Sequence, residues 1–278
     1  MENLDLVGVR FSSARPPNPT HIAWGSDRGG ALVVDGIDRI GATFADRIAR
    51  GVPRVLAVDA PLGVPVALAR DLVGMVLNGS QVLHQLTIAP PSLIDAHWAA
   101  FAASHPGALR HTEAITHGAP SITAPRPPSW RALGAFARAL APVRAQVTVL
   151  PFDSLEFTPG KPMVIEALPS AMLRLLGLPY LLHRASPSEG GPSLNEVTAE
   201  RYAVIRALPD ALAALGLRLE LPAPVANACA QDSGGDALDA VLSLVAAHLG
   251  TRGFWTPPPL TGPNAAKVLI EGWIVRPG

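Results

Sequence analysis

The amino-acid sequence predicts a single α/β domain built on a mixed sheet, and three observations support this fold class. Three short apolar segments open the chain, and a helical pattern then leads into a fourth, which gives the order β-β-β-α-β. The fourth segment, residues 54–59, is mainly apolar and ends at Asp59. A similar run, residues 163–168, contains Glu166. Continuous apolar runs of this length are typical of strands that helices cover on both faces.

The composition is that of a globular protein with a large core and no charge bias. Of the 278 residues, 49% are hydrophobic and 16% are charged, and 22 basic residues balance 22 acidic ones. The chain has no basic run of the kind that marks tight binding to long duplex nucleic acid. Cys229 is the only cysteine, which excludes an internal disulfide and a cysteine zinc cluster. No apolar run approaches the roughly 18–20 residues of a membrane span and the N-terminus lacks a basic signal segment, so we expect a cytoplasmic protein.

The first part of the chain contains four expected strands and one expected helix. The strands cover residues 6–11, 20–25, 31–34 and 54–59, with a turn at residues 26–30. Apolar residues at helical spacing indicate the helix, namely Ile37, Ile40, Phe44 and Ile48, and Gly51 would end it. Asp59 has two interpretations. Ligands of open α/β sheets bind at the carboxyl ends of strands, but an Asp before Pro61 and Gly63 is also a common first residue of a turn.

The rest of the chain is predicted to be mainly helical. Helices are expected at residues 66–77, 96–103 after a capping box at Ser92, 129–140, 169–176 and 236–249, and from Asn195 to a kink or break at Pro209. Strands are expected at residues 147–150 and 163–168, a long loop at 104–129, and a strand or packed tail at 267–275. We therefore expect one domain, residues 1–278, in which residues from about 80 to 160 form an insertion over the active edge of the sheet.

Four acidic residues stand out because their surroundings are apolar. Asp59 ends a strand, Glu166 lies inside one, and Asp236 and Asp239 share one face at the start of the last long helix. Buried carboxylates are paired, protonated or bound to a metal, and several that converge suit Mg²⁺ and a two-metal hydrolysis of phosphodiesters. The alternative is structural: Asp236 would be an N-cap, Asp239 its capping-box partner or a favourable first-turn charge, and Glu166 the partner of an arginine.

Motifs spread over most of the chain resemble one known family. They are residues 7–9 (Val-Gly-Val), 58–63 (Val-Asp-Ala-Pro-Leu-Gly), 70–71 (Arg-Asp), 166–169 (Glu-Ala-Leu-Pro), 175–180 (Leu-Leu-Gly-Leu-Pro-Tyr), 236–240 (Asp-Ala-Leu-Asp-Ala) and 271–274 (Glu-Gly-Trp-Ile). In this order they resemble the family called domain of unknown function 429 (DUF 429), predicted nucleases with a ribonuclease H-like fold. The resemblance implies a mixed five-stranded sheet, with three antiparallel strands followed by parallel strands, flanked by helices. It also implies a hydrolase whose Mg²⁺ or Mn²⁺ is held by Asp59, Glu166 and Asp239, with Asp236 assisting catalysis.

One departure from the family pattern affects the expected metal site. The family's first strand normally ends Gly-x-Asp, and that aspartate is the central metal ligand of ribonuclease H-like enzymes, whereas residues 8–10 here read Gly-Val-Arg. We expect Arg10 to be a fixed cation where the metal would lie, paired with Asp59 or Glu166. Because a guanidinium is always charged and would repel Mg²⁺, metal affinity should be poor.

Basic residues near these motifs are the candidates for binding substrate or phosphate. They are Arg10, Arg70, His183 and Arg184, the last two in place of the family's lysine after Gly-Leu-Pro-Tyr. A zinc site is not expected, although several candidate ligands occur close together: His97, His105, His111, His117 and Glu113. Their spacing matches no known zinc motif, so we interpret the histidines as solvated loop residues.

Two functions of different classes follow. The first is a divalent-metal-dependent nuclease or phosphodiesterase, which the retained acidic positions favour. The second is a catalytically inactive ribonuclease H-like module that binds nucleic acid, a nucleotide or a protein partner without a metal cofactor. The neutral net charge and Arg10 favour this second function.

Overall fold

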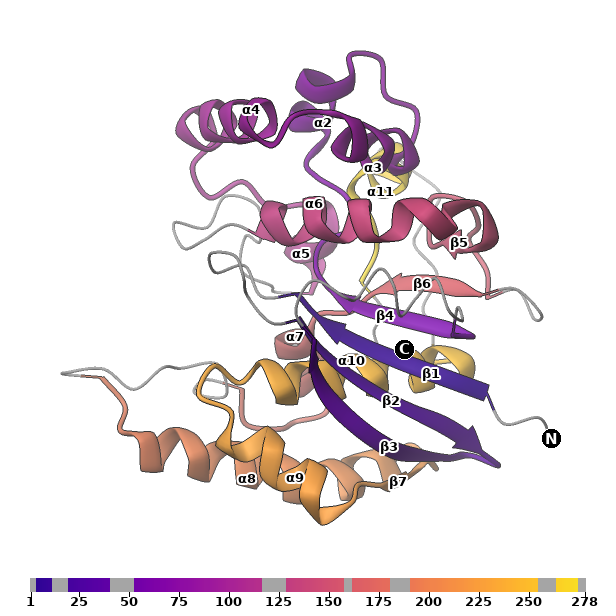
Figure 1. Ribbon diagram of the computed structural model, residues 1–278, viewed down its shortest axis with the longest axis vertical. Helices are drawn as coiled ribbons and strands as arrows, with labels where there is room; N and C mark the ends of the chain where they lie inside the picture. The colour runs from indigo at the N-terminus through magenta and orange to yellow at the C-terminus, as the bar shows by residue number, and fades with distance from the viewer. Residues whose placement is uncertain are drawn as a thin grey trace.

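A seven-stranded mixed sheet with helices on both faces forms the centre of the molecule (Figure 1). The computed structural model describes residues 4–11, 20–40, 53–116, 129–157, 162–180, 191–254 and 264–274, and all structural statements concern this part of the chain. Within it, no helix has the length and apolar character needed to cross a membrane.

The strand order is β5-β6-β4-β1-β2-β3-β7. The antiparallel strands are β1 (Leu4–Arg10), β2 (Thr20–Arg28) and β3 (Ala31–Ile40), and the parallel strands are β4 (Val55–Asp59), β5 (Thr148–Val149), β6 (Met163–Glu166) and β7 (Arg218–Glu220). The α/β class and the mixed sheet are confirmed, and three antiparallel strands followed by parallel strands are consistent with a ribonuclease H-like fold. The expected count of five strands was too low, because β5 and β7 extend the edges with only two and three residues.

The β2–β3 hairpin is longer than predicted. Its turn contains only Gly29 and Gly30, both at positive φ, and the strands continue on both sides of it. Ile37 and Ile40 belong to β3, where they pair with β2, so the helix predicted from them is wrong at its start. The rest of that predicted helix lies outside the described residues. Spacing of three between apolar residues suits a helix, but cross-strand pairing with β2 decided the conformation.

One face of the sheet is covered by the C-terminal half of the chain. This half supplies α7 (Pro169–Leu175), α8 (Leu194–Ala213), α9 (Ala223–Gln231) and α10 (Asp236–Thr251). Helix α10 packs on β1, β2 and β4, and almost all of its residues are buried. Helix α8 is capped by Ser193 instead of Asn195, and it continues through Pro209.

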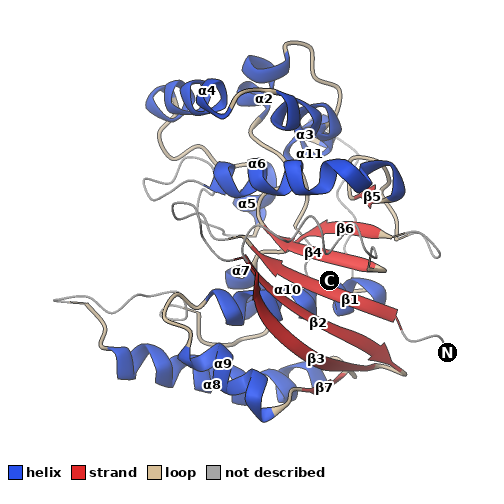
Figure 2. Ribbon diagram, viewed as in Figure 1, coloured by secondary structure: helices blue, strands red, loops and turns tan. Residues whose placement is uncertain are grey.

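The predicted insertion supplies most of the helices on the other side of the sheet, and they gather at its β4, β5 and β6 strands (Figure 2). The helices on this side are α2 (Val66–Val73), α3 (Gly79–Ile88), α4 (Pro91–Ser104), α5 (His111–Ile115), α6 (Ser129–Leu140), the 3-10 helix η1 (Ala141–Gln146) and α11 (Ala265–Glu271). Of these, α2 and α11 lie outside the predicted insertion. Helix α2 ends at Val73, earlier than predicted, with Gly74 as its C-cap, and Asn78 caps α3 instead of ending α2. Helix α5 lies inside the predicted long loop, and α11 replaces the predicted strand or tail, leaving only Ile274 bridged to β6.

Candidate functional site

Arg10 ends β1 beside Asp59, the last residue of β4. The two strands are parallel neighbours and pair these residues, so both side chains lie on the same face of the sheet. On this face α10 crosses β1 at Gly8, where a Cβ atom would lie 2.2 Å from the carbonyl oxygen of Ala240 and 2.2 Å from the backbone nitrogen of Leu244. This close approach brings the first turn of α10 to the end of β1.

Three aspartates surround the Arg10 guanidinium. Its Nη1 lies 3.0 Å from Oδ2 of Asp59, and its Nε lies 2.9 Å from Oδ1 of Asp236 and 3.7 Å from Oδ2 of Asp239. The side chains of Asp59 and Asp239 are 6% and 0% exposed, whereas those of Arg10 and Asp236 are 18% and 21% exposed. We call Asp59, Asp236 and Asp239 the aspartate cluster. The expected ion pair between Arg10 and a carboxylate is confirmed with Asp59, and Arg10 also contacts two further carboxylates, those of Asp236 and Asp239.

Arg10 balances only part of the charge of the aspartate cluster. Three carboxylates contact the guanidinium of Arg10, and two of them, Asp236 and Asp239, also interact electrostatically with the buried Arg201. The positive end of the α10 dipole adds a partial charge next to Asp236 and Asp239. Burial lowers the pKa of Arg10, but Asp59, Asp239 and Asp236 more than offset this, so the pKa lies above its ordinary value. Arg10 is therefore a permanent cation at the carboxyl end of β1 and β4.

Two buried residues near the aspartate cluster, Arg201 and His21, were not predicted from the sequence. Arg201, fully buried in α8, donates to the carbonyl oxygen of Asp232, whose carboxylate in turn accepts the N–H of Ala237 at 3.1 Å in the first turn of α10. His21 lies opposite Arg10 in the β1–β2 ladder and is 6% exposed; burial lowers its pKa. Both residues are isolated in the sequence, so no local pattern pointed to them.

Glu166 does not join the aspartate cluster. In β6 it pairs with Val58, the neighbour of Asp59 in β4. Because successive residues of a strand point to opposite faces, Glu166 lies on the face opposite to Asp59. The expected ligands Asp59, Glu166 and Asp239 are therefore divided between the two faces of the sheet and do not form one site. The apolar run around Glu166 located its strand but not the register of that strand with β4.

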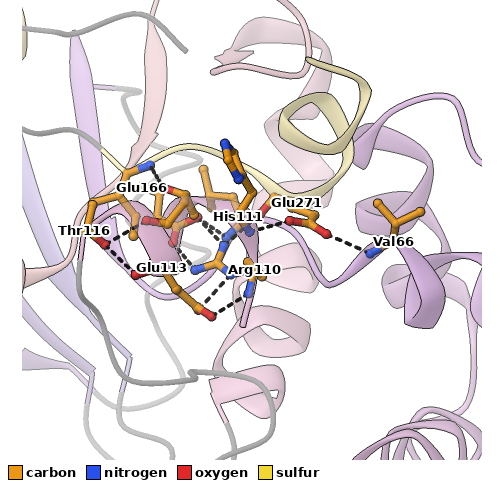
Figure 3. Close-up of polar contacts among 10 residues, drawn as sticks. Val66, Arg110, His111, Glu113, Thr116, Glu166 and Glu271 are labelled. Atoms are coloured by element: carbon orange, nitrogen blue, oxygen red, sulfur yellow. Dashed lines mark hydrogen bonds and ion pairs between the residues drawn. The ribbon is translucent and has the colours of Figure 1, made fainter. Parts of the chain in front are cut away.

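Glu166 instead belongs to a buried ion network around Arg110 (Figure 3). Nη1 and Nη2 of Arg110 donate to the Glu166 carboxylate at 2.8 and 2.5 Å, and Nε donates to Oε1 of Glu113 at 2.9 Å. The N–H of Leu62, in the loop after Asp59, donates to Oε2 of Glu166 at 2.9 Å. Burial raises the pKa of Glu166, although the charge and the hydrogen bonds of Arg110 oppose this.

Glu271 connects this network to the C-terminal segment. Its carboxylate accepts the N–H of Val66 at 3.1 Å and the N–H of His111 at 2.6 Å, and its carbonyl oxygen accepts Nη1 of Arg110 at 2.9 Å. We call Arg110, Glu113, Glu166 and Glu271 the Arg110 network; none of the four is more than 5% exposed. The motif at residues 271–274 included Glu271 but did not predict what this residue does. Nothing in the sequence around Arg110 indicated which residues Arg110 binds.

The structure places only some of the remaining candidates. Arg70 is exposed in the last turn of α2. His183, Arg184 and His117 lie outside the described residues. Among the histidines considered for zinc, His105 stacks on the ring of Phe101, with ring centroids 4.6 Å apart.

The metal site that the family resemblance implies does not fit these residues. Glu166, one of the three expected ligands, lies on the opposite face, and Arg10 contacts the carboxylates of Asp59 and Asp239 that would remain. Throughout the described ranges, no group of three or more His, Cys, Asp or Glu side chains is arranged to hold a metal ion. The aspartate cluster is therefore an ion network centred on a guanidinium.

Comparisons of the chain with protein-family models, with curated proteins and with solved structures found no match.

Proposed function

We propose that the protein is a ribonuclease H-like module, related to the DUF 429 family, that does not hydrolyse phosphodiesters with divalent metal ions. The contact of Arg10 with all three carboxylates of the aspartate cluster is the observation that carries this proposal. A two-metal mechanism needs carboxylates that are free to bind two cations, and a permanent guanidinium competes for the same oxygens. The position of Glu166 on the other face supports the proposal, because it removes an expected third ligand.

A hydrolysis assay tests this part of the proposal. We expect the purified chain to cleave neither bis(p-nitrophenyl) phosphate nor labelled single-stranded and double-stranded oligonucleotides in the presence of millimolar Mg²⁺ or Mn²⁺. The matched control is the Asp59→Asn variant, which should behave identically. Divalent-dependent hydrolysis that disappears in Asp59→Asn would refute the proposal and favour an active nuclease.

The same module is proposed to act by binding a protein partner. Several large apolar side chains of the segment from α2 to α4 are open to solvent: Met75, Leu77, Ile88 and Leu93 are 83%, 70%, 62% and 47% exposed. Exposed apolar side chains concentrated in one segment favour a protein interface. Nucleic acid is less favoured, because the formal net charge is zero and the aspartate cluster carries more negative than positive charge.

Two measurements separate these ligand classes. Fluorescence anisotropy with labelled RNA and DNA should show no binding at physiological salt, and tight binding would favour nucleic acid. Any protein that co-purifies with the chain should be lost from the double variant Met75→Ser/Leu77→Ser. It should be retained by Leu194→Ser, which alters a 54% exposed leucine at the start of α8. Equal retention by both variants would argue against an interface at the α2–α3 connection.

A further inference from the structure

Residues 72–109 are almost free of charge although most of them are open to solvent. They run from the end of α2 through α3 and α4 to the segment before α5, and only six of them are buried: Gly79, Val82, Leu83, Leu86, Ile94 and Phe101. Charged residues normally cover a protein surface, and even the chain's average of 16% would place about six in a segment of this length. The segment contains one, Asp95. We call residues 72–109 the uncharged segment.

Large apolar side chains are exposed in place of the missing charges. The four named above for the segment from α2 to α4 are joined by Leu109, which is 41% exposed. Among the described residues, these are five of the eight large apolar side chains that are at least 40% exposed. Side chains of this kind gain free energy when a second surface removes them from water, so their concentration in one segment indicates a covered surface.

Helix α4 has one apolar side that packs on the molecule and another that does not. On the inner side, Ile94 and Phe101 are buried, α4 packs on α2, and Trp98 stacks on Trp130 of α6 with ring centroids 5.7 Å apart. The outer side carries four exposed residues at a spacing of three, four and three: Leu93, Ala96, Ala100 and Ala103. Two helices pair along an apolar seam with this spacing. Helices α2 and α4 lie at the end of the molecule away from α8 and α9 (Figure 1).

The charge distribution fits a second copy of this chain better than a different protein. Identical surfaces face each other across a two-fold axis, so a net charge on one surface meets the same charge on the other. The uncharged segment avoids this repulsion, because Arg131 lies 3.7 Å from Asp95 and offsets its charge. Interfaces between copies of one chain are also more apolar than those between separately folded partners. A standard interface uses about 20–30 residues on each side, and the segment has enough exposed residues to supply them.

We propose that the uncharged segment is the interface of a homodimer, in which the outer sides of α4 from two copies pack together about a two-fold axis. The inference deepens the proposed function, on which it rests, because it names the protein partner as a second copy of this chain. Leu93 and the alanines of α4 form the centre of the contact, and Met75, Leu77 and Ile88 lie toward its edge.

Substitutions of opposite charge test the inference. Light scattering after size exclusion should give the unmodified chain, at micromolar concentration, twice the chain mass of 28.9 kDa. Leu93→Glu/Ala100→Glu and Leu93→Lys/Ala100→Lys each bring four like charges into the dimer, so each should raise its Kd by at least about 100-fold. Because both positions are exposed and Glu and Lys are good helix formers, circular dichroism should show an unchanged fold.

An equimolar mixture of the acidic and the basic variant should form a dimer again, because opposite charges then face each other. The control is Leu194→Glu, which adds a charge at a 54% exposed leucine in α8, at the other end of the molecule, and should leave the Kd unchanged.

Three results would overturn the inference: a monomeric unmodified chain, a dimer that persists in both charged variants, or a mixture of the two variants that stays monomeric. Failure of the proposed function would be seen elsewhere, as divalent-dependent hydrolysis by the unmodified chain, whatever its mass. A monomer that retains a different protein would overturn the homodimer and leave the proposed function intact.

Discussion

Replacement of Arg110 with Met should be among the most destabilising single substitutions in this chain. Arg110 is 1% exposed and donates to Glu113, to both oxygens of Glu166 and to the carbonyl oxygen of Glu271. Met fills most of the volume but supplies neither charge nor donors. Within the described part of the chain, Glu166 would then keep only the hydrogen bond from the N–H of Leu62.

Two estimates of the magnitude agree. Removal of one partner of a buried ion pair typically lowers the free energy of unfolding by about 3–5 kcal/mol. Alternatively, Glu166 would bind a proton in the folded variant, and holding a carboxyl group of ordinary pKa, about 4.3, protonated at pH 7 costs about 3.7 kcal/mol. We therefore expect a loss of about 3–4 kcal/mol at pH 7, a large part of the total stability of a typical domain.

The second estimate also fixes the pH dependence. If Glu166 is protonated in the folded variant and ionised in the unfolded chain, the folded state binds the extra proton, and lower pH favours it. The deficit relative to the unmodified chain should therefore shrink by about 1.4 kcal/mol for each pH unit between pH 7 and pH 5.

Urea unfolding followed by circular dichroism measures both quantities. The control is Arg28→Met, which breaks the exposed 3.2 Å pair with Asp35 and should cost less than about 1 kcal/mol. A cost for Arg110→Met no larger than that of the control would refute the view that the Arg110 network stabilises the fold. A deficit that does not change with pH would refute the proton uptake by Glu166.

Three further predictions concern other buried positions. Burial lowers the pKa of His248, despite the nearby Asp27, so below about pH 6.5 the unfolded chain binds a proton that the folded chain does not, and the free energy of unfolding should fall with pH. His248→Gln should make this fall with pH less steep. An unchanged pH dependence would contradict the role given to His248. Gly8→Ala should lower the free energy of unfolding by at least about 2 kcal/mol through overpacking against α10, whereas Gly134→Ala, whose Cβ would lie 3.5 Å from a flexible guanidinium in α6, should raise it by about 0.5–1 kcal/mol. Burial raises the pKa of Cys229 to about 12, so its native reaction with a thiol reagent should be roughly 100-fold or more slower than in urea, and equal rates would show that the site opens readily.

The junction at Arg10 was largely predictable from the sequence. The apolar run before Asp59 placed this residue at the end of a strand, and Arg10 ends the first strand in the same way. A parallel neighbour of similar length puts the two ends side by side, and a spacing of three places Asp236 and Asp239 on one helical face. The resemblance to the DUF 429 family added the expectation of a cation beside carboxylates, because residues 8–10 depart from that family's Gly-x-Asp.

The position of Glu166 was not predictable in the same way. Its strand was identified correctly, but a shift of one residue in the register with β4 moves a side chain to the opposite face. In a strand that is buried on both faces, the residues that point to either face are apolar. Its sequence therefore does not indicate how it is aligned with the neighbouring strand. The partner Arg110 lies in a segment where helix α5 is only five residues long, too short for a periodic pattern to show.

By itself, the sequence determined the α/β class, the buried strand that ends at Asp59, the buried strand that contains Glu166, and the helix that begins at Asp236. These features depend on local composition and periodicity, which the chain carries in any context. Only the tertiary structure decided which carboxylates share a cation: the register of β6, the approach of α10 at Gly8 and the insertion of Arg110 bring together residues that are far apart in the chain. Such contacts depend on the packing of whole elements, so no local pattern contains them.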